Sequence, residues 1–358
     1  WIMAYTTIDK PSDYFNTKIY TGTKPNTQTI TTGSFQPDWT WFKSRFEAEA
    51  PMWFDSVRGA GYYIASNNYN PQSYNTSFQS AWTSTGVTVG TAAQTNGEGA
   101  MICWNWKAGT TSGIATDGDT TITPTGYSFN QTSGFSIIKY TGNGVDGAYL
   151  PHGLGKTPKV MIVKRLVDTG WDWYVYHASM GNQKYMTLNT TAAISGTDGM
   201  WYSYTPTSVN MRMSNDAQIG ASGKDYVMYC FADIAGYSKF SQYVGNGNAN
   251  GTFVYTGFKP SWVMIKSRGS GQGWCMKTAK SNNVINGNVN NYFLQANQTN
   301  IENTSTDSSF GIDMVSNGFK LRNTDGIMNT NGENYIYMAF AETPFVANSG
   351  ESIPTTAR

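Results

Sequence analysis

The chain has 358 residues, a formal net charge of +1 and only 13% charged residues, well below the roughly 25% typical of soluble proteins. This charge balance provides no basic field for nucleic acid or an anionic membrane, so we expect neither partner. No run approaches the roughly 20 apolar residues of a transmembrane helix, which argues against membrane insertion. The three cysteines, Cys103, Cys230 and Cys275, are too few for a disulfide framework, and the apolar runs around the first two favour buried free thiols.

One long sequence pattern occurs three times along the chain. The copies start at Tyr20, Tyr140 and Tyr243, spaced by 120 and 103 residues. Each copy continues with an apolar run that ends in lysine, at 39–43, 160–164 and 262–266. Each then closes on a glycine-led apolar stretch, at 97–106, 223–232 and 332–341. Propeller blades and solenoid turns repeat at roughly 20–50 residues, so each copy is predicted to be a domain.

Short apolar runs, alternation with a period of two and turn dipeptides such as Asn-Gly and Asp-Gly predict antiparallel β-structure. The runs at 160–163 and 262–265 are apolar at every position, which predicts strands buried on both faces. A single sheet of all the strands in one copy would curl or split. We therefore predict an all-β fold of three tandem homologous antiparallel β-sandwich repeats, jelly-roll-like in type.

The predicted organisation has an attachment segment, three repeats, one linker and a tail. In chain order these are residues 1–12, 13–109 (repeat 1), 110–132 (linker or edge strands), 133–237 (repeat 2), 238–346 (repeat 3) and 347–358 (tail). Residues 120–125 and 127–129 of the linker could add edge strands to repeat 2. Almost no spacer separates repeats 2 and 3, so Ile234, Tyr237 and Phe240 are predicted to lie between them.

The sequence contains few candidate catalytic residues. His152 and His177 are the only histidines, and neither has a metal-ligand spacing. Glycoside hydrolysis needs two carboxylates roughly 5–10 Å apart. The candidates are dispersed along the chain: Asp55, Asp172, Asp313, Glu333 and Glu342. Asp55 aligns with His177 and Lys277, so no shared mechanism runs through that position, and we expect structural roles for both histidines.

Motifs for nucleophilic catalysis and phosphate binding are absent from the sequence. The stretch 116–119 (Thr-Asp-Gly-Asp) lacks the alternating oxygens and terminal Glu of a calcium loop, and a solvated turn is the favoured interpretation. We therefore predict a protein that is not an enzyme and that has no cofactor and no metal.

A basic pair recurs at the end of each apolar run. Lys43, Lys164 and Lys266 are aligned, and arginines follow them at positions 45, 165 and 268. One interpretation is three equivalent anion sites. The favoured alternative is that each stem covers apolar surface while the charge reaches water.

Aromatic residues give the strongest binding signal. In 171–173 (Trp-Asp-Trp) and 201–204 (Trp-Tyr-Ser-Tyr), alternate rings of a strand would share one face. Such rings either stack on sugars or fill the small core of a sandwich. The predicted ligand-binding residues are Trp171, Trp201, Tyr204, Trp82, Tyr74 and Tyr69.

Several phrases spread over nearly the whole chain form a specific combination. They are DKPSDYFNT (9–17), WNWKAG (104–109), GFSI (134–137), HGLG (152–155), YHAS (176–179), FADIAGYSKF (231–240) and PFVANS (344–349). Together they resemble a repeat domain found in fibre-like and other structural proteins of tailed phages, many from marine or freshwater hosts. The resemblance implies a virion-associated protein on the outer surface of a phage particle, and it assigns no catalytic residue.

The function expected from the resemblance and the residues is that of a non-enzymatic fibre, spike or decorating protein that attaches to a host-surface glycan. Its partners would be other virion proteins, the glycan and further copies of the chain, with a homotrimer as the first expectation. Two alternatives stay open. One is a capsid or tail cement protein without a ligand, and the other is a tail-spike enzyme that degrades polysaccharide.

Overall fold

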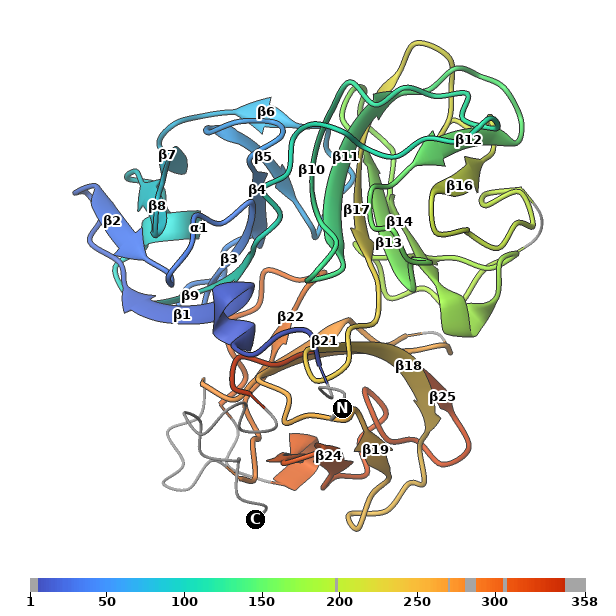
Figure 1. The fold of residues 1–358 in the computed structure, drawn as a ribbon. Helices are drawn as coiled ribbons and strands as arrows, with labels where there is room; N and C mark the ends of the chain where they lie inside the picture. Colours follow the sequence, from blue (N-terminus) through green and yellow to red (C-terminus); the bar gives the residue numbers. More distant parts are fainter. Residues whose placement is uncertain (1–5, 197–198, 270, 281–287, 305–307, 345–358) are drawn as a thin grey trace, which may run out of the picture.

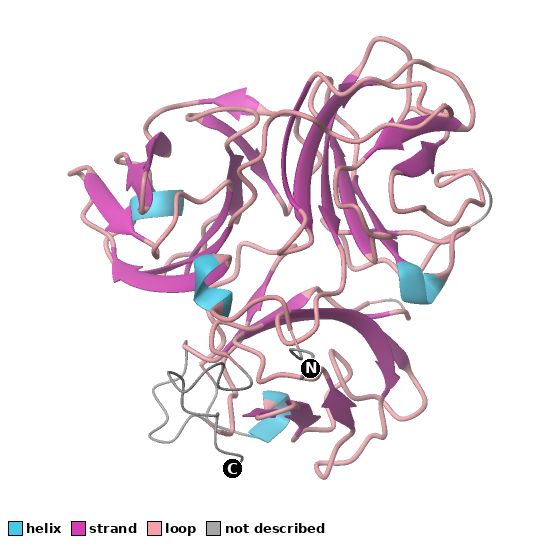
Figure 2. Cartoon of the chain, viewed as in Figure 1, coloured by secondary structure: helices cyan, strands magenta, loops and turns pink. Residues whose placement is uncertain are grey.

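The structure is a computed structural model that describes residues 6–196, 199–269, 271–280, 288–304 and 308–344. It is 39% strand and 4% helix, and its antiparallel sheets pack as β-sandwiches, which confirms the predicted fold class (Figure 2). The predicted tail and the first part of the predicted attachment segment lie outside the described residues.

The strands form three groups around a common centre, with the first group at the upper left of Figure 1, the second at the upper right and the third below. The first group contains η1 (Pro11–Asp13), β1 (Phe15–Thr21), β2 (Gln28–Thr31), β3 (Trp39–Ser44), β4 (Met52–Asp55), β5 (Tyr62–Ala65), β6 (Ser73–Tyr74), β7 (Gln79–Thr83), β8 (Gly86–Val89), α1 (Ala93–Asn96) and β9 (Ala100–Trp106).

The second group begins in the predicted linker. It contains β10 (Gly126–Asn130), β11 (Phe135–Thr141), β12 (Ala148–Pro151), β13 (Val160–Arg165), β14 (Trp173–His177), η2 (Ala178–Met180), β15 (Met186–Thr187), β16 (Asn210–Met213) and β17 (Asp225–Phe231). Strand β10 pairs with β11 and so confirms an edge strand over 127–129. Residues 120–125 form no strand, but the amides of Thr121 and Ile122 bond to the carbonyl of Tyr149 in β12.

The third group follows directly. It contains β18 (Ser238–Val244), β19 (Phe253–Tyr255), β20 (Trp262–Ser267), β21 (Cys275–Thr278), β22 (Leu294–Gln295), η3 (Ser308–Phe310), β23 (Ile312–Val315), β24 (Gly318–Leu321) and β25 (Asn334–Phe340).

The main sheet of each group has the same order of five strands. The orders are β1-β9-β3-β4-β5, β11-β17-β13-β14-β15 and β18-β25-β20-β21-β22, with β6 and β10 as extra edge strands. A smaller sheet completes each group, namely β2-β8-β7, β12-β16 and β19-β24-β23. The matching orders are what a threefold repeat predicts, while the homology of the groups and the domain boundaries stay predictions.

The middle strands of each main sheet are buried on both faces. In β13, Val160 and Ile162 point into a core shared by all three groups, whereas Met161 and Val163 point into the second group's own core. Strands β3 and β20 alternate in the same way. Because successive side chains of a strand face opposite ways, a strand between two apolar layers must be apolar throughout. The prediction from the uninterrupted apolar runs is therefore confirmed.

The shared core, here called the central core, is rich in aromatic rings. Trp39 lies 4.0 Å from Trp106 between ring centroids, and Trp106 lies 5.8 Å from Trp262. Phe231 of the second group lies 5.9 Å from Trp39 and 6.0 Å from Phe340. Rings from all three groups thus meet in the central core.

The connection between the second and third groups contributes to the same core. Ile234, Tyr237 and Phe240 are buried there, as predicted, and the Tyr237 ring packs 5.8 Å from that of Phe340. The short connection therefore fixes the second group against the third.

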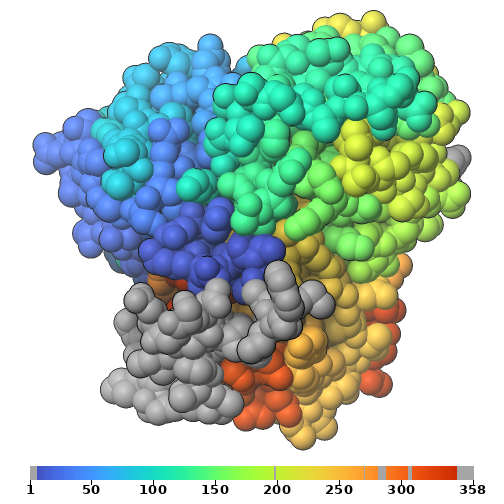
Figure 3. All heavy atoms as spheres, viewed as in Figure 1, coloured from blue at the N-terminus to red at the C-terminus, as the bar shows by residue number. Residues whose placement is uncertain are grey.

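Backbone hydrogen bonds join the groups in a closed ring. In each junction, an amide in the loop that follows β5, β15 or β22 donates to the carbonyl just after β13, β20 or β3. The three bonds are Gln72 N to Leu166 O (3.2 Å), Ile194 N to Arg268 O (2.9 Å) and Glu302 N to Arg45 O (3.0 Å). The first group thus contacts the second, the second the third and the third the first, and the space-filling view shows the groups in contact (Figure 3).

The three aligned lysines lie at these junctions and are fully buried. Each ammonium donates to a backbone carbonyl of the neighbouring group: Lys43 to Thr299 (3.0 Å), Lys164 to Tyr69 (3.2 Å) and Lys266 to Thr191 (3.3 Å). Both interpretations of these lysines are wrong, because the neighbouring loop covers the end of the strand. The charges neither reach water nor stand open to an anion, and burial lowers the pKa of each lysine to about 8.

Replacing Trp262 with alanine is expected to destabilise the whole protein by about 3–5 kcal/mol, because it opens a cavity in the central core. Urea unfolding would measure this loss. The exposed Tyr255, 60% accessible in the same group, is the control, and Tyr255→Ala is expected to change stability by less than about 0.5 kcal/mol. Equal effects of the two substitutions would contradict the placement of Trp262.

A second prediction concerns the pH dependence of stability. The pKa of Lys164 is about 8 in the folded state and roughly 10.4 in an unfolded chain, so between these values the unfolded state binds more protons. Stability from this group therefore rises with pH in that window. The stability of the wild type relative to Lys164→Met should increase by about 1 kcal/mol per pH unit from pH 8 to pH 10.

Burial raises the pKa of Cys103, Cys230 and Cys275, so these thiols make stability fall as the pH rises. The thiols are the same in the wild type and in Lys164→Met. The difference in stability between the two proteins therefore reports on Lys164. Lys156→Met, at an exposed lysine, is the matched control. A wild-type-to-Lys164→Met difference that stays constant from pH 7 to pH 10 would contradict the account.

Candidate functional site

Both histidines are buried and hydrogen-bonded on both ring nitrogens. His152 accepts from the amide of Leu154 at 3.3 Å through Nδ1, and its Nε2 lies 3.2 Å from the Thr207 carbonyl. In His177, Nδ1 accepts from an amide and Nε2 lies 3.2 Å from the Tyr337 carbonyl. This pattern suits the neutral ring with the proton on Nε2, and burial lowers the pKa of each histidine to about 4. Each histidine therefore ties backbone segments together.

Each of the five candidate carboxylates is bound to a partner of its own. Asp55 is buried, pairs with Arg58 and accepts a hydrogen bond of 2.6 Å from the Tyr229 hydroxyl of the second group. The others bind elsewhere: Asp172 accepts from Asn189, Asp313 pairs with Arg322, Glu333 accepts from Ser267, and Glu342 pairs with Lys280. The five carboxylates thus bind five different partners.

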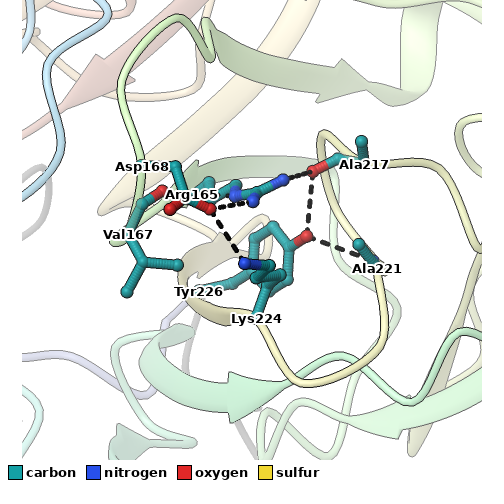
Figure 4. A network of polar contacts seen from close by, with 7 residues as sticks. All are labelled: Arg165, Val167, Asp168, Ala217, Ala221, Lys224 and Tyr226. Carbon is teal, nitrogen blue, oxygen red and sulfur yellow. Dashed lines mark hydrogen bonds and ion pairs between the residues drawn. The ribbon is translucent and has the colours of Figure 1, made fainter.

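Arg165, which follows the buried Lys164, is held by a network within the second group (Figure 4). Its guanidinium donates to the carbonyls of Val167 (3.2 Å) and Ala217 (3.0 Å) and pairs with Asp168. The hydroxyl of Tyr226 donates to the same Ala217 carbonyl at 2.9 Å. This arginine therefore fastens two loops and is not an open anion site.

The predicted patch of Trp171 and Trp201 is wrong. Trp201 is 0% exposed, packs in the core of the second group and donates its indole N–H to the Lys184 carbonyl at 3.1 Å. The predicted strand over 201–204 is a turn, because Tyr202 and Ser203 have φ values of +49° and +48°. Alternation therefore does not apply there, and the turn sends Trp201 inward. Trp171 is partly exposed, but the Arg165 guanidinium lies 4.6 Å from its ring centroid.

The three predicted residues of the first group lie in separate settings. Tyr74 is 57% exposed and its ring packs 4.9 Å from that of Tyr62. Tyr69 is 54% exposed at the first junction, where its carbonyl binds Lys164. Trp82 is half-buried against the first group's own core. These residues offer single rings or one pair and form no larger aromatic surface.

Tyr204, the last predicted residue, belongs to a larger aromatic cluster. The rings of Tyr149, Tyr202 and Tyr204 surround the guanidinium carbon of Arg212 at 4.9, 4.4 and 5.5 Å. Tyr149 and Tyr204 also meet edge to face at 5.7 Å. All four side chains are partly exposed. We call this set the tyrosine platform.

Two neighbouring strands and one turn build the platform. Tyr149 in β12 and Arg212 in β16 are direct cross-strand partners. Their neighbours along the strands, such as Leu150 and Met211, are buried in the second group's core, so alternation turns Tyr149 and Arg212 outward. The turn at 200–203 brings Tyr202 and Tyr204 over the same arginine.

Neutral polar groups border the platform. The Asn182 amide donates to the Ser203 carbonyl at 2.9 Å, and the Gln183 amide lies 3.1 Å from the Ser203 hydroxyl. On the linker side, the amide of Tyr149 donates to the Thr121 hydroxyl at 2.8 Å. The site therefore combines partly exposed ring faces with hydroxyl, amide and guanidinium groups.

A polar groove of about 690 Å³ lies between the first group and the linker. Its floor holds Asp38, which accepts hydrogen bonds from Ser56 (2.7 Å), Ser128 (3.1 Å) and the Ala108 amide (2.8 Å). Burial raises the pKa of Asp38. Because the Ser128 bond crosses from the first group to β10, Asp38 helps to attach β10 to the first group.

Sequence reasoning missed Tyr149, Tyr202 and Arg212. A usable signal exists for Arg212, which stands between two methionines in a strand and is therefore expected to point outward. Tyr149 has the same setting between Ala148 and Leu150. No local signal places Tyr202, since its position depends on the turn.

No group of three or more His, Cys, Asp or Glu side chains in the described part of the chain is arranged to hold a metal ion. Within the same residues, no helix has both the length and the apolar character needed to cross a membrane.

Fold and site define an all-β protein of packed sandwiches with an outward-facing tyrosine platform. Comparison with known families gives one match, to a domain of unknown function (DUF7483), over residues 10–344. The chain therefore belongs to the DUF7483 family. No curated protein and no solved structure matches it significantly.

Proposed function

We propose that this protein is a non-enzymatic structural component of a tailed-phage particle, in the manner of a fibre, spike or decorating protein, and that it attaches to a host-surface glycan through the tyrosine platform. The main support for this proposal is the cluster of Tyr149, Tyr202 and Tyr204 around Arg212 on the outside of the second group.

The chemistry of the platform suits sugars. The C–H faces of a pyranose pack on aromatic rings, each such contact contributing roughly 1 kcal/mol by analogy with other aromatic contacts. The tyrosine hydroxyls and the nearby Asn182, Gln183 and Ser203 add neutral donors and acceptors for sugar hydroxyls. Such an array binds through several weak contacts, which become useful when many copies act together.

The body of the molecule supports a role in a particle. Its three groups close into a ring around the central core, so the platform stands on a stiff base. Charged residues are only 13% of the chain, and the surface relies on neutral polar groups. These properties agree with the resemblance of the sequence phrases to the repeat domain of tailed-phage proteins. That resemblance is the reason for placing the protein on the outer surface of a virion.

The double substitution Tyr149→Ala and Tyr204→Ala is expected to lower binding of the purified protein to host cells or their extracted surface glycans at least tenfold. Two stacking contacts of roughly 1 kcal/mol each are lost. Fluorescence-based cell binding and circular dichroism would measure attachment and folding. Tyr62→Ala together with Tyr255→Ala, two exposed tyrosines outside both the platform and the predicted ligand-binding residues, is the matched control. Undiminished binding by the folded platform variant would remove this site.

We also propose that copies of the chain associate on the particle, with a homotrimer as the first expectation. Appendages of virions gain grip from symmetry, and weak sites need multivalency. Light scattering of the full chain should then show a species larger than one chain. A strict monomer, both alone and with the particle protein that anchors it, would contradict this part of the proposal.

A further inference from the structure

Arg212 differs from most arginines of the chain in its partners. Four described arginines form ion pairs with carboxylates of the chain: Arg45 with Glu302, Arg58 with Asp55, Arg165 with Asp168 and Arg322 with Asp313. Among the described residues, Arg212 has no carboxylate partner. Its charge is therefore left available at the protein surface.

The guanidinium of Arg212 is nevertheless held in place. Its Nε donates to the Gly147 carbonyl at 3.1 Å, and three tyrosine rings surround it. Its two terminal nitrogens have no hydrogen-bond acceptor within the described part of the protein. A fixed, planar pair of free N–H groups matches the two oxygens of a carboxylate.

We infer that the platform selects acidic glycans, with Arg212 binding the carboxylate of a uronic or sialic-type sugar while the tyrosines pack on its ring. This inference rests on the proposed glycan attachment and names the class of sugar. The rings orient the arginine, and a charge-assisted hydrogen bond from it to a carboxylate is stronger than one between neutral groups.

Two acidic residues near the platform set a limit on its affinity. Burial and Tyr149 raise the pKa of Tyr204, and Asp119 and Asp117 act in the same direction. Both aspartates are exposed, but Asp117 already accepts hydrogen bonds from Asn210 and Thr120. Asp119 should therefore repel an acidic sugar, and its removal should strengthen binding.

The test uses the full chain with three acidic probes, oligogalacturonate, alginate oligomers and oligosialic acid, each beside its carboxyl-reduced neutral counterpart. Calorimetry or an immobilised-glycan assay would compare each pair. At least one acidic probe should bind tenfold or more tightly than its reduced form, as expected for a charge-assisted hydrogen bond. Arg212→Gln should abolish that difference, and Asp119→Asn should increase affinity for the acidic form severalfold.

Arg268→Gln is the matched control, because Arg268 lies in the third group and bonds to Gln242. Circular dichroism of each variant separates loss of binding from loss of folding. Equal binding of acidic and reduced probes would overturn the inference and leave glycan attachment standing. Absence of binding to every probe, acidic and reduced, together with platform-independent cell attachment, would overturn both proposals. Acid-selective binding that persists in folded Arg212→Gln would show that another residue is responsible.

Discussion

The packing of three main sheets by their inner faces around one aromatic core is the interaction on which the rest of the structure depends. A sandwich on its own would leave the outer face of β3, β13 or β20 exposed, with Trp39, Val160 or Trp262 in water. Burying that face against two neighbours removes a large apolar area from water and leaves no group complete without the others. The inter-group amide bonds and the buried lysines follow from this arrangement, because a strand end enclosed by a neighbour must bond to that neighbour's backbone.

The same constraint decides where function can lie. The two histidines, the buried carboxylate of Asp55 and the aligned lysines lie inside the sandwiches or at the junctions, where backbone groups or a neighbouring side chain bind them. The outer sheets and their turns are the parts free to differ between groups. At one cross-strand position the second group carries Tyr149 and Arg212, the third Phe253 and Lys320, and the first a pair of threonines. The tyrosine platform is thus specific to the second group, although all three groups share the strand order that supports it.

Local sequence patterns predict much of the fold, whereas the candidate site depends on turns and on contacts between segments that are distant in the sequence. Uninterrupted apolar runs reveal strands such as β13 because a strand between two layers has no polar face. The burial of Lys164 could not be read from the sequence, since the covering loop is about 95 residues away along the chain. Trp201 was misplaced because two left-handed residues after it break the alternation that a strand would impose. The sequence marks Tyr204 as a candidate because of its aromatic ring. Its neighbours Tyr149 and Arg212 come from β12 and β16, which only the folded chain brings beside it.

Native-state hydrogen exchange, followed by mass spectrometry at increasing urea, tests the shared core most directly. If the three groups depend on one core, the slowest amides of β9, β17 and β25 should converge on one opening free energy and one urea dependence, as expected for a single cooperative unit. Separate opening of one group, with its central strand exchanging at a clearly lower free energy while the other two stay protected, would contradict the account.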